Sequence, residues 1–345
     1  MTVTVAPDDK SMKDDSEEDI KTQFLEKLAA GLYVFAFVIA PFVSMTICII
    51  VFMTPLLWTI GIPYLIWYAY DFHAPRRGSR PWRAFTSFWL WRYLACYFPM
   101  RLVKTAELPP NKNYVIGVHP HGIIGFATFV TFCTEGTHFS RLFPGLRRFP
   151  VTLPMQFWFP LRREFLTLTG TISSDVEAIE YVLDRPPKGY VVAIVPGGAA
   201  EALDSHPDTY DLTLKNRRGF IRLAIKHGAD LVPLYHFGEN KIYSQLPNPH
   251  GSRLRTFQMA VKRWTGATVP IFYGRGILSN IIGLMPYRKP ITTVVGAPIP
   301  VKCNPNPSEE ECDELHAEYC RRLVALFDEH KTKYGIDKDI QLRIV

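Results

Sequence analysis

A long uncharged stretch near the N-terminus constrains the fold of this chain more than any other feature. No side chain from Leu28 to Tyr70 is charged, and the stretch is twice as long as the ~20 apolar residues that one transmembrane helix needs. Pro41 and the group Pro55, Gly61 and Pro63 predict breaks within it, because proline removes a helical hydrogen bond. We therefore predict a membrane-embedded helical hairpin over residues 28–70, which either re-enters the membrane or forms two spans, with a buried helical pair of a soluble protein as the alternative.

The segments on either side of this stretch differ in charge. Residues 1–27 are polar and acidic, which predicts a disordered tail and argues against a cleaved signal peptide. Residues 71–100 are rich in arginine and aromatic side chains, which is typical of a segment at the membrane interface. This basic flank indicates the cytosolic side, so a hairpin places the remaining domain, residues 101–345, in the cytosol.

The charge and the cysteines limit the class of protein. The net charge is +7 and the pI is about 9.0, which favours an anionic partner. The arginines are scattered and form no nucleic-acid-binding module, so we expect no nucleic acid but a phosphorylated small molecule near a membrane. The six cysteines have no paired spacing, which favours a reducing compartment over a disulfide scaffold.

The pattern after residue 113 alternates between strands and helices. Apolar runs at 114–118, 189–195, 231–235 and 292–295 predict strands. Residues 175–183, 216–227 and 308–333 predict helices, the last with a capping box from Ser308 to Glu311. Strands that alternate with helices favour an α/β fold with a mostly parallel sheet and flanking helices. Residues 123–133 are compatible with a helix or a buried strand.

The tetrapeptide His119-Pro120-His121-Gly122 directly follows the first of these strands. Open α/β sheets bind their ligands at the carboxyl ends of the strands. Histidine is the side chain whose ordinary pKa best suits general base catalysis near neutral pH, and Gly122 allows a substrate to approach the backbone closely. We predict that His119 and His121 are catalytic; the alternative is that they only cap the strand.

Three further groups follow later strands or begin helices. In Pro196-Gly197-Gly198-Ala199-Ala200-Glu201, the N–H groups of Gly197 and Gly198 could hold an oxyanion. Glu201 could orient an imidazole, or it is an ordinary residue of a first helical turn. Arg217 and Arg218 could pair with phosphates or form a solvated basic surface. Asn240 and Glu239 could line the site or cap the strand that they follow.

Several other chemistries lack their motifs. The chain contains no Gly-x-Ser-x-Gly, no P-loop and no dinucleotide-binding glycine motif. Cys312, His316 and Cys320 share one helical face, and three ligands on one helix do not close a tetrahedral site. We therefore expect neither a metal nor a bound cofactor.

Several segments together resemble the diacylglycerol acyltransferase type 2 family, which also includes monoacylglycerol and wax-alcohol acyltransferases. They are His119–Gly122, Pro196–Leu203, Asn216–Phe220, Gly228–Pro233, Phe237–Asn240 and Pro290–Gly296. The resemblance extends from about residue 97 to the C-terminus, and the N-terminal hairpin is also typical. Pro196 and His236 depart from the family pattern, in which a hydrophobic and a small residue are usual.

The resemblance implies an acyltransferase-like sheet behind a membrane hairpin, in a multi-pass enzyme of the endoplasmic reticulum membrane that is also found at lipid droplets. It implies acyl transfer from acyl-CoA to diacylglycerol, or alternatively to monoacylglycerol or a long-chain alcohol. It leaves the oligomeric state open, with a homo-oligomer as one option.

The residues and the resemblance together suggest a mechanism. His121, or alternatively His119, would take the proton of the acceptor hydroxyl, and Glu201 would orient that imidazole. N–H groups near Gly122, Gly197 and Gly198 would receive the oxyanion. The CoA phosphates would meet Arg217 and Arg218, with Arg162 or Arg163 as further candidates.

Two other classes remain open from the sequence alone. A His-x-His motif after a strand also binds metal in amidohydrolase barrels, where His227 or His236 could add ligands. The second is a non-catalytic lipid-binding membrane protein that has the same fold.

Overall fold

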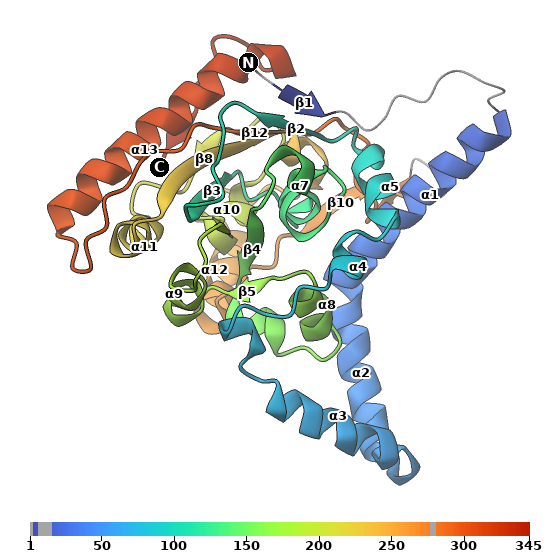
Figure 1. Cartoon of the computed structure of the whole chain (residues 1–345). Coiled ribbons are helices and arrows are strands. Elements are labelled where there is room, and N and C mark those ends of the chain that lie inside the picture. Colours follow the sequence, from blue (N-terminus) through green and yellow to red (C-terminus); the bar gives the residue numbers. More distant parts are fainter. Residues whose placement is uncertain (1–2, 6–15, 277–280) are drawn as a thin grey trace.

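The centre of the protein is an eight-stranded sheet (Figure 1) in a computed structural model that describes residues 3–5, 16–276 and 281–345. The strand order is β1-β2-β12-β8-β3-β6-β4-β5. In chain order these strands are β1 (Val3–Val5), β2 (Arg101–Lys104), β3 (Tyr114–His119), β4 (Arg147–Thr152), β5 (Ile172–Ser173), β6 (Tyr190–Ile194), β8 (Asp230–Phe237) and β12 (Thr292–Val295). Only the β1–β2 and β12–β8 pairs of this sheet are antiparallel. The predicted α/β fold with a mostly parallel sheet is thus confirmed.

The four strands predicted from the sequence are the four adjacent strands β12, β8, β3 and β6. All of β3, β8 and β12 is buried, which explains why each is a continuous apolar run in the sequence. Alternate side chains of β3 enter different parts of the core. Val115 packs with the helices of one face, whereas Ile116 and Val118 pack on the other face.

Three amphipathic helices cover the first face. They are α9 (Val176–Leu183), α11 (Gly219–His227) and α13 (Glu309–His330). Side chains of all three share one buried cluster with β3, β6 and β8. The predicted capping box of Ser308 and Glu311 is present at the start of α13. Helix α11 begins at Gly219 rather than at residue 216, because residues 214–217 form a turn.

Short helical segments cover the second face. They are α5 (Leu90–Tyr97), α6 (Phe126–Thr128), the π-helix η4 (Phe129–Cys133) and α7 (Phe139–Leu142). The ambiguous residues 123–133 are therefore mostly helical. The aromatic segment that follows residue 82 forms two helices, α4 (Arg83–Thr86) and α5, with a break at residues 87–89.

The N-terminal helix runs from the core out into the surroundings (Figure 1). Helix α1 (Ser16–Val34), the π-helix η1 (Phe35–Ile39) and α2 (Ala40–Met53) are continuous, and Glu18–Met53 is the one helix among the described residues that is long and apolar enough to span a membrane. Ala29, Ala30 and Tyr33 of α1 are buried against α5 and α6, whereas Phe42 and Met53 of α2 are 73% and 78% exposed.

Helix α3 (Trp58–Tyr70) follows a short 3-10 turn, η2 (Pro55–Leu57), and packs beside α2. A Cβ on Gly61 of α3 would lie 2.7 Å from a methyl group of Val51 in α2, so glycine permits this close contact. With 13 residues, α3 is about 20 Å long and too short to cross a ~30 Å hydrocarbon core. The structure thus shows one potential span, and a hairpin remains a prediction.

Part of the N-terminal tail differs from the predicted disorder. Residues 16–27 form the first turns of α1, because a helix extends readily from the stable apolar helix that follows. Residues 3–5 form β1 at the edge of the sheet. Residues 1–2 and 6–15 lie outside the described part of the chain.

The remaining elements are short or peripheral. The helices are η3 (Ala74–Arg76), η5 (Pro154–Phe157), α8 (Arg162–Leu168), α10 (Gly198–Asp204), η6 (Glu239–Lys241), α12 (Arg253–Thr265) and η7 (Thr332–Tyr334). The strands are β7 (Asp211–Leu212), β9 (Ser244–Gln245), β10 (Phe272–Arg275), β11 (Ile282–Gly283) and β13 (Arg343–Ile344), which form two small separate sheets.

Candidate active site

His119 is the last residue of β3, and its side chain is fully buried. Nε2 lies 3.0 Å from the hydroxyl of Tyr319, and this hydroxyl donates to the carbonyl oxygen of Gly117 at 3.1 Å. Nε2 therefore carries the proton of the neutral ring and donates it to Tyr319. Nδ1 is a buried acceptor without a partner among the described residues. Burial lowers the pKa of His119 to about 3, so the imidazole is neutral.

His121 lies just beyond the strand and is partly exposed. Its Nδ1 lies 2.9 Å from the carbonyl oxygen of Gly122. A carbonyl only accepts hydrogen bonds, so Nδ1 carries the proton and Nε2 keeps its lone pair. Burial of the ring lowers the pKa of His121, although the Gly122 carbonyl opposes the shift. The ring is therefore a neutral imidazole whose Nε2 accepts no hydrogen bond from a described residue, which is the form that a general base needs.

Glu201 of α10 holds the loop that carries His121. Oε1 accepts the main-chain N–H of His121 at 2.7 Å, and Oε2 accepts the N–H of Thr213 at 3.3 Å. We expected Glu201 to orient the imidazole directly, but its carboxylate contacts the backbone of His121 instead. A Cβ on Gly197 would lie 1.8 Å from Oε2, so only glycine fits there. Burial raises the pKa of Glu201 to about 7.

Glu239 likewise binds main-chain N–H groups, but of the segment that follows Gly122. Its Oε1 and Oε2 accept the N–H groups of Phe126 and Ala127, each at 3.0 Å. Burial raises the pKa of Glu239 to about 7, and a Cβ on Gly122 would lie 2.5 Å from Oε1. The sequence left open whether this residue lines the site or only caps its strand. Its place in the Phe237–Asn240 segment was the available signal, but a sequence does not show which N–H groups a carboxylate meets.

The other predicted residues of the site have different surroundings. Gly198 has φ +56 and no atom within 4 Å of the position of a Cβ, so space is open beside it. Asn240 accepts the Ser205 hydroxyl at 2.9 Å and donates to the carbonyl oxygen of Thr209 at 3.3 Å, so it fixes the loop after α10. Asn240 also lines a cavity beside Pro120.

This cavity has a volume of about 630 Å³. It lies on the face of the sheet that α13 covers, and its wall includes Pro120, the residue between the two histidines. Its basic residues are Arg101, Lys241, Lys289 and Lys333. Lys241 pairs with Asp208 at 3.1 Å, whereas the other three have no ion pair with any residue that the structure describes. We call this the lysine cavity.

The arginines that we expected near phosphates divide into two groups. Arg217 is exposed, has no ion pair within the described part of the chain, and lies near enough to Glu201 to oppose the rise of its pKa. Arg218 is instead paired with Asp313 of α13.

Arg162 and Arg163 do not face a phosphate site, so that expectation was wrong. Arg162 donates to the carbonyl oxygens of Ala36 and Phe37 at 3.1 and 2.9 Å, which η1 leaves available. Arg163 is 1% exposed and pairs with Asp71 at 2.6 Å. Both arginines attach the N-terminal helices to the rest of the protein.

The N-terminal helix reaches the loop after Gly122. The hydroxyl of Tyr33 donates to the carbonyl oxygen of Ile124 at 2.9 Å. The ring of Tyr33 contacts Phe126 and Phe129, with centroid distances of 4.2 and 4.7 Å. An aromatic cluster thus joins the candidate site to the helix that is apolar enough to enter a membrane.

The histidines of the amidohydrolase alternative have separate partners. His236 lies 2.8 Å from the hydroxyl of Thr293, and His227 lies 2.7 Å from Asp184. Within residues 3–5, 16–276 and 281–345, no group of three or more metal-ligating side chains comes together. His236, one of the two departures from the family pattern, thus connects β8 to β12.

Comparison with known proteins identifies the family. The sequence model described as diacylglycerol acyltransferase matches residues 49–345. The chain is 47% identical to mouse 2-acylglycerol O-acyltransferase 1, over 81% of this chain and 83% of that protein. It is 44% identical to mouse diacylglycerol O-acyltransferase 2 over 83% of this chain and 74% of that protein, and 40% identical to the human protein of that name over 93% and 82%.

No solved structure matches the chain, so the assignment depends on the sequence comparisons. The family model covers most of the chain, and it includes the tetrapeptide and both buried carboxylates described above. The chain therefore belongs to the diacylglycerol acyltransferase family and is an acyltransferase enzyme.

Proposed function

We propose that this enzyme transfers an acyl group from acyl-CoA to the free hydroxyl of diacylglycerol and so forms triacylglycerol. The observation that carries the proposal is the free Nε2 of His121, since Nδ1 of the same ring is engaged with the Gly122 carbonyl at 2.9 Å. His119 is the weaker candidate for the base, because its ring is fully buried and Nε2 already donates to Tyr319.

The proposed reaction moves one proton away from the acceptor and back to the leaving group. The acceptor hydroxyl attacks the thioester carbonyl, and Nε2 of His121 takes its proton. The tetrahedral oxyanion then collapses, the C–S bond breaks, and the imidazolium returns the proton to the CoA thiolate. General base catalysis of this kind contributes roughly 10²–10⁴-fold. The Gly197 N–H is our candidate oxyanion donor, because the Gly198 N–H already donates to the carbonyl oxygen of Val195 at 3.1 Å.

We assign the CoA phosphates to the lysine cavity. It adjoins Pro120, and Lys289 and Lys333 line it without ion pairs among the described residues. Arg217 is a second candidate, because it lies near Glu201 and is unpaired in the described part of the chain, whereas Arg218 is engaged with Asp313. Acyl-CoA is a co-substrate here, and the proposed chemistry needs neither a metal nor a bound cofactor.

A second acceptor is supported by a specific observation. The identity to mouse 2-acylglycerol O-acyltransferase 1 is 47%, compared with 44% for mouse diacylglycerol O-acyltransferase 2. Monoacylglycerol is therefore the alternative acceptor, and the same base and the same carboxylates would serve it.

We also propose that the enzyme is anchored in the endoplasmic reticulum membrane, with the residues after 100 on the cytosolic side. The helix Glu18–Met53 supports a membrane anchor, and the contact between Gly61 and Val51 supports a hairpin that turns back within the bilayer. Lipid droplets are a second location that such a hairpin allows, since it needs no aqueous compartment on its far side.

The proposal is tested with membranes from cells that express the wild-type chain, His121→Ala, His119→Ala or His250→Ala. Labelled oleoyl-CoA is supplied with diacylglycerol, 2-monoacylglycerol or hexadecanol, and the products are separated. We expect triacylglycerol formation to fall by at least about 100-fold in His121→Ala. His250 is exposed and distant in sequence from the tetrapeptide, so His250→Ala should match the wild type.

Each other outcome changes a defined part of the proposal. If product forms only from 2-monoacylglycerol or hexadecanol, that lipid is the acceptor in place of diacylglycerol, and the proposed mechanism is unchanged. A larger loss in His119→Ala than in a folded His121→Ala would assign the base to His119. No product from a folded, membrane-bound protein would support the non-catalytic lipid-binding protein.

A further inference from the structure

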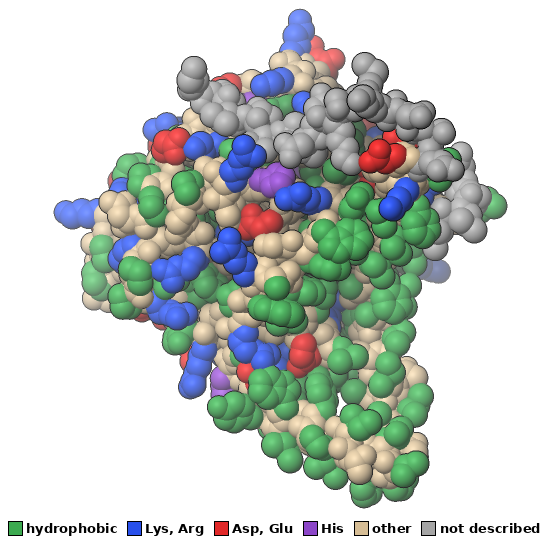
Figure 2. All heavy atoms as spheres, turned by 45° about the vertical axis from the view of Figure 1, so that its right-hand side comes forward, with side chains coloured by type: hydrophobic (Ala, Val, Ile, Leu, Met, Phe, Trp, Pro, Cys, Tyr) green, Lys and Arg blue, Asp and Glu red, His purple; other side chains and the backbone are tan. Residues whose placement is uncertain are grey.

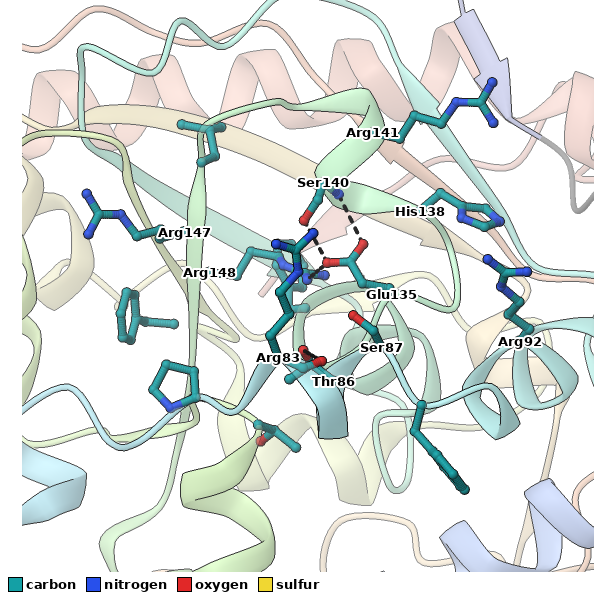
Figure 3. Close-up of a pocket in the computed structure, with 16 residues that line it drawn as sticks. Arg83, Thr86, Ser87, Arg92, Glu135, His138, Ser140, Arg141, Arg147 and Arg148 are labelled. Carbon is teal, nitrogen blue, oxygen red and sulfur yellow. Dashed lines mark hydrogen bonds and ion pairs between the residues drawn. The ribbon is translucent and has the colours of Figure 1, made fainter.

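A second basic cavity lies beside β4 and the helices α4 and α5 (Figure 3). Its volume is about 610 Å³. Five arginines line it, with His138 beside them and Glu135 as the one acidic residue in its described wall. The arginines are Arg83, Arg92, Arg141, Arg147 and Arg148. We call it the arginine cavity, and no step of the proposed reaction uses it.

Four of these five arginines have no acidic partner in the described part of the chain, although Arg147 lies over the ring of Tyr190 at 4.6 Å. Arg148 pairs with Glu135 and donates to the carbonyl oxygen of Thr131 at 2.8 Å, so it is part of the scaffold. The other four arginines have no ion pair with a described residue. Arg83 extends toward Arg148 and Glu135 in Figure 3, and Arg92 borders the same space. Cations without an acidic partner that line one cavity are suited to binding an anion there.

The arginine cavity is separate from the candidate active site. In the sheet, Arg148 of β4 lies opposite Val191 of β6, and Val191 lies opposite Tyr114 at the beginning of β3. His119 lies five residues further along that strand, about 17 Å away at the usual rise of a strand. The cavity is thus at the amino edge of the sheet, whereas the histidines are at the carboxyl edge.

The cavity lies next to the part of the protein that faces the membrane. Residues of α4 and α5 line it, and α5 packs against the N-terminal helix. Trp82, Phe88 and Trp89 around it are 58%, 43% and 51% exposed. Exposed aromatic side chains of this kind are typical of the headgroup level of a bilayer. Figure 2 shows a continuous hydrophobic surface that continues from the globular part down along the N-terminal helices, with Lys and Arg side chains beside it.

We propose that the arginine cavity binds the phosphate headgroup of an anionic phospholipid. Arginine forms bidentate hydrogen bonds with phosphate, and the position beside the interfacial aromatics favours a lipid over a soluble anion. Acyl-CoA also carries phosphates, but its thioester must reach His121 at the other edge and its phosphates have the lysine cavity nearby. The inference concerns binding alone; only the preference for a lipid over acyl-CoA rests on the proposed function, and it does not depend on the acceptor.

The test is a calorimetric titration of the purified full-length protein in a neutral detergent. The probe is dioctanoyl phosphatidic acid, with dioctanoyl phosphatidylcholine as the neutral control lipid. The variant Arg83→Gln/Arg92→Gln removes two unpaired cations from the cavity. Arg321→Gln/Arg322→Gln is the matched control, since these exposed arginines of α13 pair only with Glu318. Thermal unfolding verifies that each variant is folded, and Arg92→Gln alone replaces the double variant if that one is not.

We expect phosphatidic acid to bind the wild type and the control variant equally, and its Kd to rise at least about 10-fold in Arg83→Gln/Arg92→Gln. Free CoA should not displace it. Displacement by CoA, with an equal loss of CoA affinity in the double variant, would assign the cavity to CoA phosphates. Absent binding, or equal binding of phosphatidylcholine, would also overturn the proposal.

Discussion

The hydroxyl of Tyr319 lies 3.0 Å from Nε2 of His119, although 200 residues separate them in the chain. The same hydroxyl donates to the carbonyl oxygen of Gly117 and occupies the space that a Cβ there would fill, 1.9 Å away. Helix α13 thereby fixes the end of β3, from which the tetrapeptide His119-Pro120-His121-Gly122 begins.

Tyr319→Phe should destabilise the protein by about 1–3 kcal/mol, because it leaves the buried N–H of His119 without an acceptor. Gly117→Ala should cost more, since its methyl group collides with the Tyr319 hydroxyl. Thermal unfolding in detergent measures both. Tyr181→Phe is the control, because Tyr181 is 41% exposed. Unfolding midpoints for Tyr319→Phe that equal those of Tyr181→Phe would contradict the importance of this contact.

Glu201 should make stability depend on pH. Its pKa rises from 4.5 to about 7 in the folded protein, so between these values the native state retains a proton that the unfolded state releases. The contribution of this group to stability therefore falls as pH rises from 4.5 to 7. Unfolding midpoints at a series of pH values should show a steeper decline for the wild type than for Glu201→Gln. A difference between the two proteins that stays constant with pH would show that Glu201 does not titrate in this range.

Lys289 and Lys333 should determine the affinity for acyl-CoA. Since both line the lysine cavity without an ion pair among the described residues, Lys289→Ala/Lys333→Ala should raise the KM for oleoyl-CoA about 10-fold or more. The kcat should change little, because neither lysine touches the reacting atoms. Added salt should raise the KM of the wild type more than that of the variant. An unchanged KM would show that the CoA phosphates do not bind in this cavity, and Arg217 would then be the remaining candidate for binding them.

Asp71→Ala should destabilise the protein by about 3–5 kcal/mol, because Arg163 is 1% exposed and would keep its charge without this partner. Asp313→Ala removes the partner of Arg218 at an exposed site and should cost less than about 1 kcal/mol. Thermal unfolding of the two variants compares them directly. Equal midpoints would mean that Glu164, which already pairs with Arg163 at 3.2 Å, is sufficient to stabilise its charge.

The sequence predicted the centre of the fold better than its edges. Strands β3, β6, β8 and β12 consist mostly of apolar residues because they are buried on both faces, so their sequence pattern could be recognised. Strand β4 begins with Arg147 and Arg148, so its pattern did not suggest a strand. The antiparallel direction of β12 depends on the connection from β8, which composition does not reveal.

The candidate site shows the same limit at the level of single contacts. The tetrapeptide and Glu201 were predictable because residue type and position after a strand are local properties. That Glu201 holds the main chain of His121, and that Glu239 holds Phe126 and Ala127, results from tertiary packing across about 80 to 113 residues. The roles of Arg162 and Arg163 were missed for the same reason, since their partners belong to the N-terminal helices.

The unbroken helix Glu18–Met53 has a kinetic consequence. Its 36 residues extend about 54 Å, well beyond a ~30 Å hydrocarbon core, and its first part is packed into the catalytic domain through Tyr33. The proposed anchor is therefore a rigid continuation of the globular domain. It would hold that domain at the membrane surface. A lipid acceptor then arrives by two-dimensional diffusion, so the rate should follow the mole fraction of acceptor in the bilayer and not its amount per volume of solution.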